Sequence, residues 1–487
     1  MANVLLLYPP YTYPRKNPPI GLAYIAAALQ QHGHDVEILD LNVTKWRARE
    51  LRDKVSTGRY TVFGISFMTN QFGEAGRLAR LLKAEASEVP IIVGGPHASA
   101  IPERTLEEVP EVDAACVGEG EQTMCEYVHA ILDGGSLSNI GGLVFRDGSG
   151  SPVRNAVRPL VADVDRIPFP AWGLLPLSRY SVYAPRKGRQ QETFALLSSR
   201  GCPNRCIFCD SHTVFGRKFR GRSAKNIFEE IMTLHKKYGM TQFDFVDDLI
   251  TVKKDRVLRL CALLRNSGIR FRWMANARVN TVDAEMLRAM KEAGCTRIDL
   301  GVESGDPEVR RTCRKAVTDR QIINAHSDAH ALGISTNTFL MVGNLGESFE
   351  SVRMTAKLMK ELAQDTNIAI ACPYPGTELY RIAMRNHWIR THDWNQYVTS
   401  PTYFPGYKPV MVTDTMTEKD IMAAYYYLHS FFARRKFQAR YGRFFFLNRH
   451  FMGEWLFRSS AQGGLVRKFK MFLRLVRSRF LRVGHRA

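Results

Sequence analysis

The feature that most constrains the fold is a regular alternation of short apolar runs and helical patterns along most of the chain. In the first 135 residues, aliphatic and β-branched runs predict strands at residues 3–8, 35–41, 61–68, 90–94 and 113–117. Helical patterns separate these runs, for example at residues 21–31. This order predicts a doubly wound, Rossmann-like parallel sheet with helices on both faces.

From residue 193 the alternation resumes, with predicted strands at residues 194–198, 242–246, 270–275, 297–302, 335–342 and 366–371. Six strand–helix units are more than a flavodoxin-like sheet uses, and they predict a partial (β/α)6 barrel. Both architectures bind ligands at the carboxyl ends of their strands. We therefore expect the functional residues at those ends.

The domain organisation follows from these two alternating stretches. A chain of 487 residues, 45% of them hydrophobic, is long enough for several domains. We predict an α/β protein with a Rossmann-like domain at residues 1–135 and a linker at residues 136–192, which holds a hairpin turning at Asp147-Gly148. The partial barrel is predicted at residues 193–400, and a helical, strongly basic region at residues 401–487.

Cysteine usage and the N-terminus bear on the location of the protein. Of nine cysteines, three lie within eight residues and six are scattered, which is typical of thiols in a reducing compartment. No basic segment precedes the first apolar run, and no apolar run reaches the roughly 18 residues of a membrane-spanning helix. We expect a cytoplasmic protein.

The C-terminal region carries most of the net charge of +21. Residues 429–487 hold fifteen Lys or Arg against one acidic residue, Glu454. Apolar residues recur there at spacings of three and four over residues 465–483, which predicts a basic amphipathic helix. Such a helix suits peripheral contact with an anionic membrane, or packing on the barrel with a solvated basic face.

The strongest chemical signal is the loop after the first barrel strand, which holds Cys202, Cys206 and Cys209. Three thiolates can hold three irons of a 4Fe-4S cluster and leave the fourth iron open to a ligand. A structural zinc site needs four protein ligands, and only Asp210 or His212 is near enough in sequence to be the fourth. Zinc binding and plain buried thiols are the alternatives.

This C-x-x-x-C-x-x-C loop resembles that of the radical S-adenosylmethionine superfamily, and the resemblance covers residues 193–380. It implies that the open iron binds S-adenosylmethionine, which an electron from the cluster cleaves to methionine and a 5'-deoxyadenosyl radical. Cys202, Cys206 and Cys209 match the cluster ligands. Phe208 matches the aromatic residue beside the adenine.

Other strand ends resemble the positions with which this superfamily holds S-adenosylmethionine. Asp247 and Asp248 stand where the family often has Gly-Gly-Glu, a departure that still offers carboxylates to the methionine ammonium. Asn276 and Arg278 follow the third strand, and the resemblance pairs Arg278 with the methionine carboxylate. Glu303 matches the ribose-binding glutamate. Each charged residue alone could equally belong to a solvated loop or a structural ion pair.

The first domain resembles the cobalamin-binding module that precedes many such barrels, through residues 17–24, 94–97 and 117–121. Its candidate cobalamin-binding residues lie at strand ends and are Ser66, Gly94, Gly95, Gly118, Glu119 and Gly120. Glycines there let a bulky ligand approach the backbone. The alternative is that they only form tight turns.

One pattern of the cobalamin family is missing from the first domain. Many members place D-x-H-x-x-G after the first strand, and its histidine binds cobalt, but this loop has no histidine. A literal match at residues 328–333 falls in a predicted barrel helix, and we interpret it as coincidence. His97 is the single strand-end histidine of this domain, and we expect it to pack or cap. Cobalt should therefore receive no protein imidazole.

The resemblance implies a cobalamin-dependent radical enzyme that methylates an unactivated carbon of a small molecule or lipid. An electron donor such as flavodoxin or ferredoxin would reduce its cluster. The alternatives are cyclisation or ring rearrangement, as in the anaerobic cyclase of chlorophyll synthesis, and a radical enzyme without cobalamin. A zinc-stabilised protein that binds nucleic acid through the basic tail is the hypothesis from another class.

Overall fold

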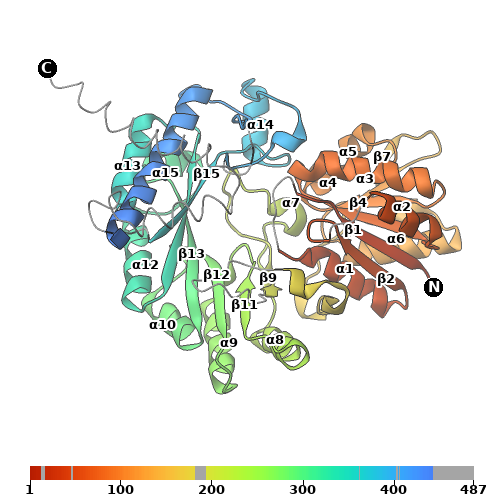
Figure 1. Ribbon diagram of the computed structural model, residues 1–487, viewed down its shortest axis with the longest axis horizontal. Coiled ribbons are helices and arrows are strands. Elements are labelled where there is room, and N and C mark those ends of the chain that lie inside the picture. The colour runs from red at the N-terminus through yellow and green to blue at the C-terminus, as the bar shows by residue number, and fades with distance from the viewer. Residues whose placement is uncertain are drawn as a thin grey trace.

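The computed structural model describes residues 1–11, 17–44, 48–180, 194–360, 362, 364–401, 404 and 406–441. Two α/β units lie side by side, the first next to the N-terminus and the second around a six-stranded sheet (Figure 1). The short helix α7 (His212–Phe215) lies between them in this view. The α/β class predicted from the sequence is confirmed.

The first sheet has the strand order β2-β1-β3-β4-β5-β6-β7. Its five parallel strands are β1 (Asn3–Tyr8), β2 (Asp35–Asp40), β3 (Val62–Ser66), β4 (Ile91–Gly94) and β5 (Ala114–Cys116). Each lies within a range predicted from its apolar run. In β1, Val4 and Leu6 pack into one core while Leu5 and Leu7 pack into another. Alternate side chains of a strand that is buried on both faces must do this.

Helices cover both faces of this sheet. The helices α1 (Ile20–Gln31) and α6 (Gly120–Asp133) pack together on one face. On the other face lie α2 (Ala48–Thr57), α3 (Phe72–Glu85) and α5 (Pro102–Glu108). A five-residue helix, α4 (Pro96–Ala100), follows β4 directly. The doubly wound arrangement is confirmed.

The predicted hairpin extends the first sheet. Its strands β6 (Leu143–Arg146) and β7 (Pro152–Arg154) pair antiparallel, and β6 pairs antiparallel with β5. The side chain of Asp147 accepts hydrogen bonds from the backbone N–H groups of Ser149 and Ser151, which holds the turn. The hairpin therefore belongs to the first sheet, and the four domain boundaries remain a proposal.

The second sheet is fully parallel, in the order β15-β14-β13-β12-β11-β8. Its strands are β8 (Phe194–Leu196), β11 (Gln242–Phe245), β12 (Arg272–Arg278), β13 (Cys295–Glu303), β14 (Ser335–Val342) and β15 (Asp365–Ile370). Because β8 and β15 are both edges, the sheet does not close. This confirms the partial six-stranded barrel.

Helices cover the outside of this sheet. They are α8 (Ala224–Tyr238), α9 (Lys254–Asn266), α10 (Ala284–Glu292), α12 (Asp319–Ala331) and α13 (Phe349–Met359). Two shorter helices follow strand ends: α11 (Pro307–Thr312) comes after β13, and α14 (Glu378–Arg385) packs on Ile207 of the cysteine loop and on Met341 of β14. His330, in the literal D-x-H-x-x-G match, lies in α12 and contacts Thr336 Oγ1 at 2.9 Å. Its place in a barrel helix is as predicted.

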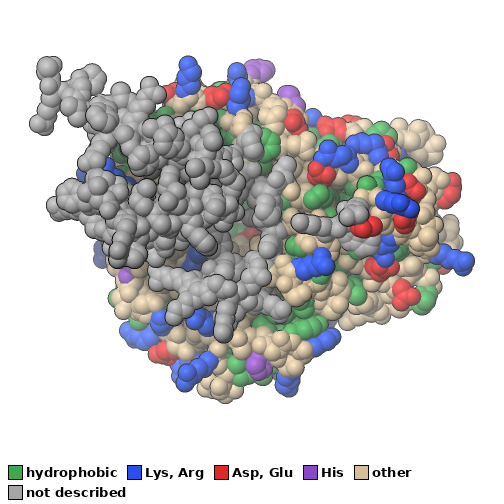
Figure 2. All heavy atoms as spheres, in the orientation of Figure 1, with side chains coloured by type: hydrophobic (Ala, Val, Ile, Leu, Met, Phe, Trp, Pro, Cys, Tyr) green, Lys and Arg blue, Asp and Glu red, His purple; other side chains and the backbone are tan. Residues whose placement is uncertain are grey.

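The C-terminal helix α15 (Glu418–Tyr441) packs against β15 and α13. At its start the Thr417 hydroxyl donates to Asp420 at 2.7 Å, which caps the first turn. The predicted basic helix at residues 465–483 lies outside the described residues. None of the described helices is long and apolar enough to span a bilayer. Over the visible face of the first domain, basic and acidic side chains intermingle (Figure 2).

Candidate functional site

The three candidate cluster cysteines lie on one loop at the carboxyl end of the barrel sheet. The loop runs from β9 (Ser199–Arg200) to α7, and β9 pairs antiparallel with β10 (Arg220–Gly221) at its base. Gly201 starts the loop with a φ of 81°, and a Cβ there would lie 2.3 Å from the Lys218 carbonyl oxygen. Only glycine allows this tight entry to the cysteine loop.

Each cysteine sulfur has a polar neighbour. Asn204 Nδ2 donates to Cys202 Sγ at 3.2 Å, and Arg278 Nη1 donates to Cys206 Sγ at 3.5 Å. The Ser211 hydroxyl lies 3.5 Å from Cys209 Sγ. Hydrogen-bond donors directed at sulfur stabilise thiolates and shift the reduction potential of an iron–sulfur cluster. These three neighbours therefore suit cysteines that bind such a cluster.

Burial raises the pKa of the free Cys209 thiol to about 11. A thiolate at this position therefore needs a compensating cation, such as the iron of a cluster.

The geometry gives the zinc alternative no support. Among the described residues, no three His, Cys, Asp or Glu side chains converge enough to hold a single metal ion. His212, one candidate fourth ligand, has Nδ1 3.0 Å from the Cys209 carbonyl oxygen. Three spaced thiolates suit a cluster with a separate iron for each sulfur.

The adjacent carboxylates after β11 have different surroundings. Asp247 is buried and accepts from the Ser198 backbone N–H and hydroxyl, each at 2.7 Å, and from the Ser199 hydroxyl. Burial raises its pKa, while Arg256 and these donors oppose the shift. Asp248 is exposed, although desolvation by the surrounding protein raises its pKa to about 6. The carboxylate of Asp247 is thus fully used in hydrogen bonds to Ser198 and Ser199, whereas the carboxylate of Asp248 remains accessible.

The third-strand candidates lie beside the cysteine loop. Asn276 Nδ2 donates to the Asp247 carbonyl oxygen at 3.3 Å. Arg278 is buried, and besides Cys206 its guanidinium contacts Asn280 Oδ1 at 3.2 Å and the Lys315 carbonyl oxygen. Contact with a cluster cysteine places Arg278 at the site. Its pairing with the methionine carboxylate stays a prediction.

Glu303 ends β13 in a strained conformation. Its φ is 69°, unusual for a non-glycine residue, and its carboxylate pairs with Lys315 Nζ at 2.7 Å. Arg314 and Ala316, on either side of Lys315, also have positive φ. Strain of this kind persists where surrounding contacts impose it, and it clusters at functional sites. Sequence reasoning missed Lys315, because no spacing rule links it to Glu303.

Phe208, within the cysteine loop, packs against the ends of two barrel strands. It is half-buried and packs against an apolar cluster that includes Met341, at the end of β14, and Ala371, just beyond β15. A half-exposed ring over the barrel mouth is suited to lie against a flat ligand. Its contact with adenine remains a prediction.

The first domain presents Ser66 and Gly94 as register partners at the ends of β3 and β4. A Cβ on Gly94 would meet its nearest protein atom at an ordinary 3.8 Å, so neither packing nor φ demands glycine there. At Gly95, with a φ of 94°, a Cβ would lie 2.7 Å from the Phe67 carbonyl oxygen. A tight turn therefore explains the glycine at position 95 but not the glycine at position 94, where the missing side chain leaves space for a ligand. This edge fits a bulky cofactor.

The candidates after β5 have different roles. Gly118 has a φ of 85°, which favours glycine, whereas a Cβ on Gly120 would lie 3.1 Å from the tip of the Ile25 side chain, a close neighbour that can shift. Glu119 is buried, and each of its carboxylate oxygens accepts two N–H groups, from Arg200, Arg220 and the Val161 backbone. Its side chain is committed to these contacts. Cobalamin contacts by the backbone here remain a prediction.

His97 packs as expected. Its ring is fully buried among Phe67, Phe72 and Trp394, with centroids 5.0 to 5.5 Å apart, and Nδ1 lies 3.3 Å from Thr69 Oγ1. Burial lowers its pKa to about 3. A neutral ring enclosed by aromatic neighbours is a packing element, consistent with the expectation that it does not bind cobalt.

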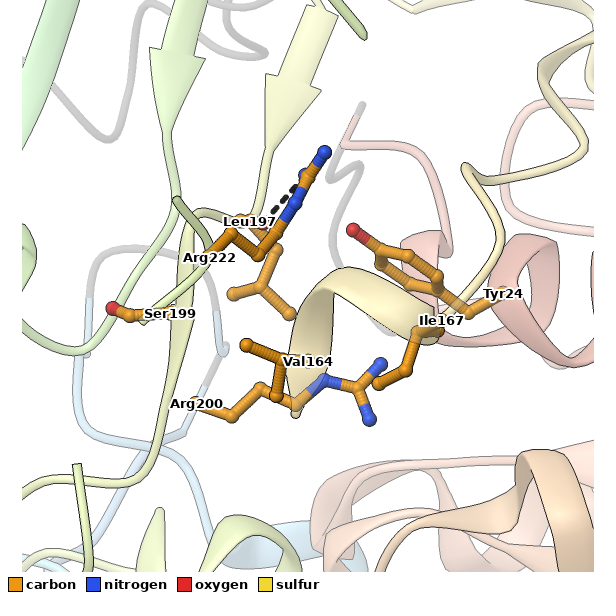
Figure 3. A pocket seen from close by; sticks show the side chains of 7 residues that line it. All are labelled: Tyr24, Val164, Ile167, Leu197, Ser199, Arg200 and Arg222. Atoms are coloured by element: carbon orange, nitrogen blue, oxygen red, sulfur yellow. Dashed lines mark hydrogen bonds between the residues drawn. The ribbon is translucent and has the colours of Figure 1, made fainter. Parts of the chain in front are cut away.

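A small cavity lies where the first domain meets the barrel (Figure 3). Tyr24 of α1 approaches it from one side, and Arg200 and Arg222 approach from the barrel side. Its volume of about 10 Å³ leaves room for little more than one water molecule. It is therefore a packing void at the domain junction and not a cofactor site.

A three-cysteine loop on a partial parallel barrel, preceded by a doubly wound domain, defines a radical enzyme with a cofactor-binding domain in front. Two family models match the chain accordingly: the B12 binding domain over residues 12–128 and the radical SAM superfamily over residues 196–359. An uncharacterised methyltransferase of Pyrococcus horikoshii is 33% identical over 406 residues, which cover 82% of this chain and 87% of that protein. The chain belongs to this family of cobalamin-binding radical S-adenosylmethionine enzymes.

Other relatives span two reaction types. A hopanoid C-3 methylase of Methylococcus capsulatus is 28% identical over 80% of this chain and 73% of its own length. An anaerobic magnesium-protoporphyrin IX monomethyl ester cyclase of Rubrivivax gelatinosus is 28% identical over 75% of this chain and 66% of its own length. Among solved structures, the radical S-adenosylmethionine methyltransferase TsrM of Kitasatospora setae superposes with a TM-score of 0.65. It is 20% identical over 86% of this chain and 80% of its own, which supports the fold.

Family membership confirms the enzyme hypothesis over the nucleic-acid-binding one, and it confirms three cofactors. They are a 4Fe-4S cluster, S-adenosylmethionine and cobalamin. Such an enzyme needs a reductant for its cluster.

Proposed function

We propose that this chain methylates an unactivated carbon of a small-molecule or lipid substrate, in a space bounded by the cysteine loop and the Ser66–Gly94 edge. The observation that carries the proposal is that buried side chains join the loop after β5 to the strand that leads into Cys202. When bound, the cluster and S-adenosylmethionine supply the radical that removes hydrogen, and methylcobalamin supplies the methyl group.

The side chains at the strand ends bind and orient S-adenosylmethionine and cobalamin. Asp248 offers an accessible carboxylate to the methionine ammonium, and Arg278, held against Cys206, directs its charge toward the cluster. Lys315 holds the Glu303 carboxylate at the ribose position. Ser66 and Gly94 leave room for cobalamin at the edge of the first sheet. We propose these roles from the accessibility and contacts of each side chain.

The reaction is tested by product stoichiometry. A methylase of this type uses one S-adenosylmethionine to recharge cobalamin and another to make the radical. Each methylated product should therefore accompany one S-adenosylhomocysteine and one 5'-deoxyadenosine. With candidate substrates deuterated at the attacked carbon, the label should appear in 5'-deoxyadenosine. Turnover that forms 5'-deoxyadenosine without matching S-adenosylhomocysteine would refute methylation and favour cyclisation or rearrangement.

We further propose that a flavodoxin or ferredoxin delivers the electron at the outer side of the cysteine loop. Arg205, Arg217 and Lys218 are exposed there, and none forms an ion pair with a carboxylate of the described residues. Arg217 Nη1 donates to the Asn204 carbonyl oxygen at 2.8 Å, which holds this cation on the loop itself. An acidic carrier would be steered to such a patch.

The docking proposal is tested by replacing these three residues with alanine. At low salt, cluster reduction by reduced flavodoxin should slow by about ten-fold or more, since electrostatic steering contributes that much to association. Reduction by dithionite should stay the same. Alanine replacement of Lys225, Lys236 and Arg259, exposed on α8 and α9, is the matched control. Equal slowing in both variants would contradict the proposal.

The basic tail belongs to a second proposal about location. We propose that the enzyme is cytoplasmic and that residues 443–487 contact anionic membranes peripherally, because each Lys or Arg near such a surface contributes about 1 kcal/mol. A chain that ends at Gly442 should sediment less with anionic liposomes than the full chain, and neutral liposomes should bind neither. Equal sedimentation would assign the tail a structural role.

A further inference from the structure

A buried network of four charges connects the two loops that face the proposed cofactors. Arg200 Nη1 lies 2.9 Å from Glu119 Oε1, and Arg200 Nη2 lies 2.5 Å from Glu121 Oε1. Arg220 Nη1 lies 2.8 Å from Glu119 Oε2. Because Arg200 and Arg220 are register partners in β9 and β10, their side chains reach the same carboxylate together. Both glutamates come from the start of α6 and the residue before it.

The network is enclosed and balanced. Its side chains are 3% to 13% exposed, and two guanidinium groups face two carboxylates. Burial alone lowers the pKa of Arg200, but Glu121 and Glu119 outweigh it and raise that pKa above its usual value. The rings of Tyr24 and Phe215 flank the Arg200 guanidinium at 5.1 and 5.3 Å. Arg200 bridges the two carboxylates with one nitrogen on each, and buried charge-assisted hydrogen bonds of this kind restrict distance and orientation.

The network adjoins both the cysteine loop, which would hold the cluster, and the loop after β5, which would contact cobalamin. Arg200 stands two positions before Cys202, and Glu119 follows Gly118 at the end of the β5 edge. A shift of either guanidinium would carry the start of the cysteine loop with it. The network thus ties the entrance of the cysteine loop to the first domain.

The exit of the cysteine loop is also fixed to the first domain. Helix α7, which follows Cys209, contacts α4 at the end of β4. A Cβ on Gly376 would lie 2.7 Å from Thr213 Cγ2 of α7 and 3.0 Å from Ala100 Cβ of α4, so this junction is tightly packed. The cysteine loop is therefore held to the first domain at both of its ends.

We propose that Glu119, Glu121, Arg200 and Arg220 are positioning residues that set the distance between cobalamin and the iron–sulfur cluster. The inference rests on the proposed function, which requires both cofactors in one site. Methyl transfer needs the donor within contact of a carbon that is activated beside the cluster, and small displacements strongly reduce such reactions. A buried, charge-balanced network in which Arg200 bridges two carboxylates is suited to hold that spacing.

The experiment compares E119Q and E121Q with E230Q in the cluster- and cobalamin-loaded enzyme. The control removes the charge of an equally buried pair, because Arg222 Nη1 lies 2.5 Å from Glu230 Oε2 and these side chains are 7% and 2% exposed. That pair joins the segment after β10 to α8 and contacts neither cofactor loop. Pulsed EPR of partly reduced enzyme measures the dipolar coupling between the reduced cluster and cob(II)alamin, which depends on the inverse cube of their separation.

We expect a broadened or shifted coupling in E119Q, a smaller change in E121Q, and a coupling like wild type in E230Q. An unchanged coupling in E119Q and E121Q would overturn the inference, and so would an equal change in E230Q. Selective loss of cobalamin from E119Q would also overturn it, because Glu119 would then bind the cofactor itself. If E119Q does not fold, E121Q decides. Wild-type enzyme without cobalamin would instead refute the proposed function.

Discussion

Replacement of Asp247 by alanine should destabilise the protein, whereas replacement of Asp248 by asparagine should weaken its hold on S-adenosylmethionine. Asp247 accepts three hydrogen bonds from Ser198 and Ser199, and none of these groups is exposed. Its loss leaves the Ser198 backbone N–H without an acceptor and removes the carboxylate that supports the charge of Arg256.

The cost can be estimated from these contacts. A hydrogen bond to a charged group contributes about 1.5 to 3 kcal/mol, and a buried donor left without an acceptor costs about 1 to 3 kcal/mol. Because these contributions overlap, we expect a total loss of about 2 to 4 kcal/mol for Asp247→Ala. This is a large share of the roughly 5 to 15 kcal/mol by which proteins are usually stable.

Asp248 has fewer partners: its side chain is exposed, and a hydrogen bond with Ser211 only partly offsets the desolvation that raises its pKa to about 6. Since a raised pKa means that the ionised form is disfavoured in the folded protein, Asp248→Asn should not destabilise the protein at pH 7. Loss of a charged hydrogen bond to the methionine ammonium, about 1.5 to 3 kcal/mol, corresponds to roughly ten-fold to hundred-fold weaker binding.

Urea unfolding and calorimetric titration of cluster-loaded enzyme with S-adenosylmethionine separate the two effects. The reasoning is refuted if Asp247→Ala unfolds like wild type, or if Asp248→Asn binds S-adenosylmethionine as tightly as wild type does.

Two further predictions concern the cofactors. Simultaneous replacement of Cys202, Cys206 and Cys209 by alanine should abolish the visible thiolate-to-iron absorbance and the bound iron and sulfide, and a retained cluster would contradict the ligand assignment. His97→Phe should keep cobalamin without changing the nitrogen hyperfine signals of cobalt, and loss of an imidazole signal would show that His97 binds it. Since the pKa of His97 falls to about 3 on folding, its neutral ring contributes stability that is complete above about pH 6.5 and is lost progressively toward pH 3. Urea midpoints measured at pH 7 and pH 5 should therefore differ less in His97→Phe than in wild type.

Most of the fold was predictable because it depends on local and periodic properties of the chain. Residues 3–8 and 335–342 were predicted as strands with the bounds that the structure has, since each is a β-branched or aliphatic run that is buried in a parallel sheet. The cysteine loop was predictable for a related reason. The spacing of three cysteines on one short segment limits their possible separations in any fold.

The separate roles of Asp247 and Asp248 needed tertiary information. Both residues lie in the loop after β11, so no strand periodicity assigns them to different environments. Which carboxylate became buried depended on the position of Ser198 and Ser199, about fifty residues earlier in the chain. No local pattern contains that pairing.

Glu119 shows that a sequence motif can predict the backbone shape of a loop without predicting what each of its side chains contacts. Gly118 keeps the backbone geometry of the loop with its positive φ, which a sequence pattern can encode because φ is a local property. A carboxylate takes whichever donors tertiary structure brings within about 3 Å. For Glu119 those donors are Arg200 and Arg220, which come from the other domain and are 81 and 101 residues away. A charged residue inside a ligand-binding motif can therefore form ion pairs across a domain interface instead of contacting the ligand. The structure, which shows its partners, is needed to tell these two roles apart.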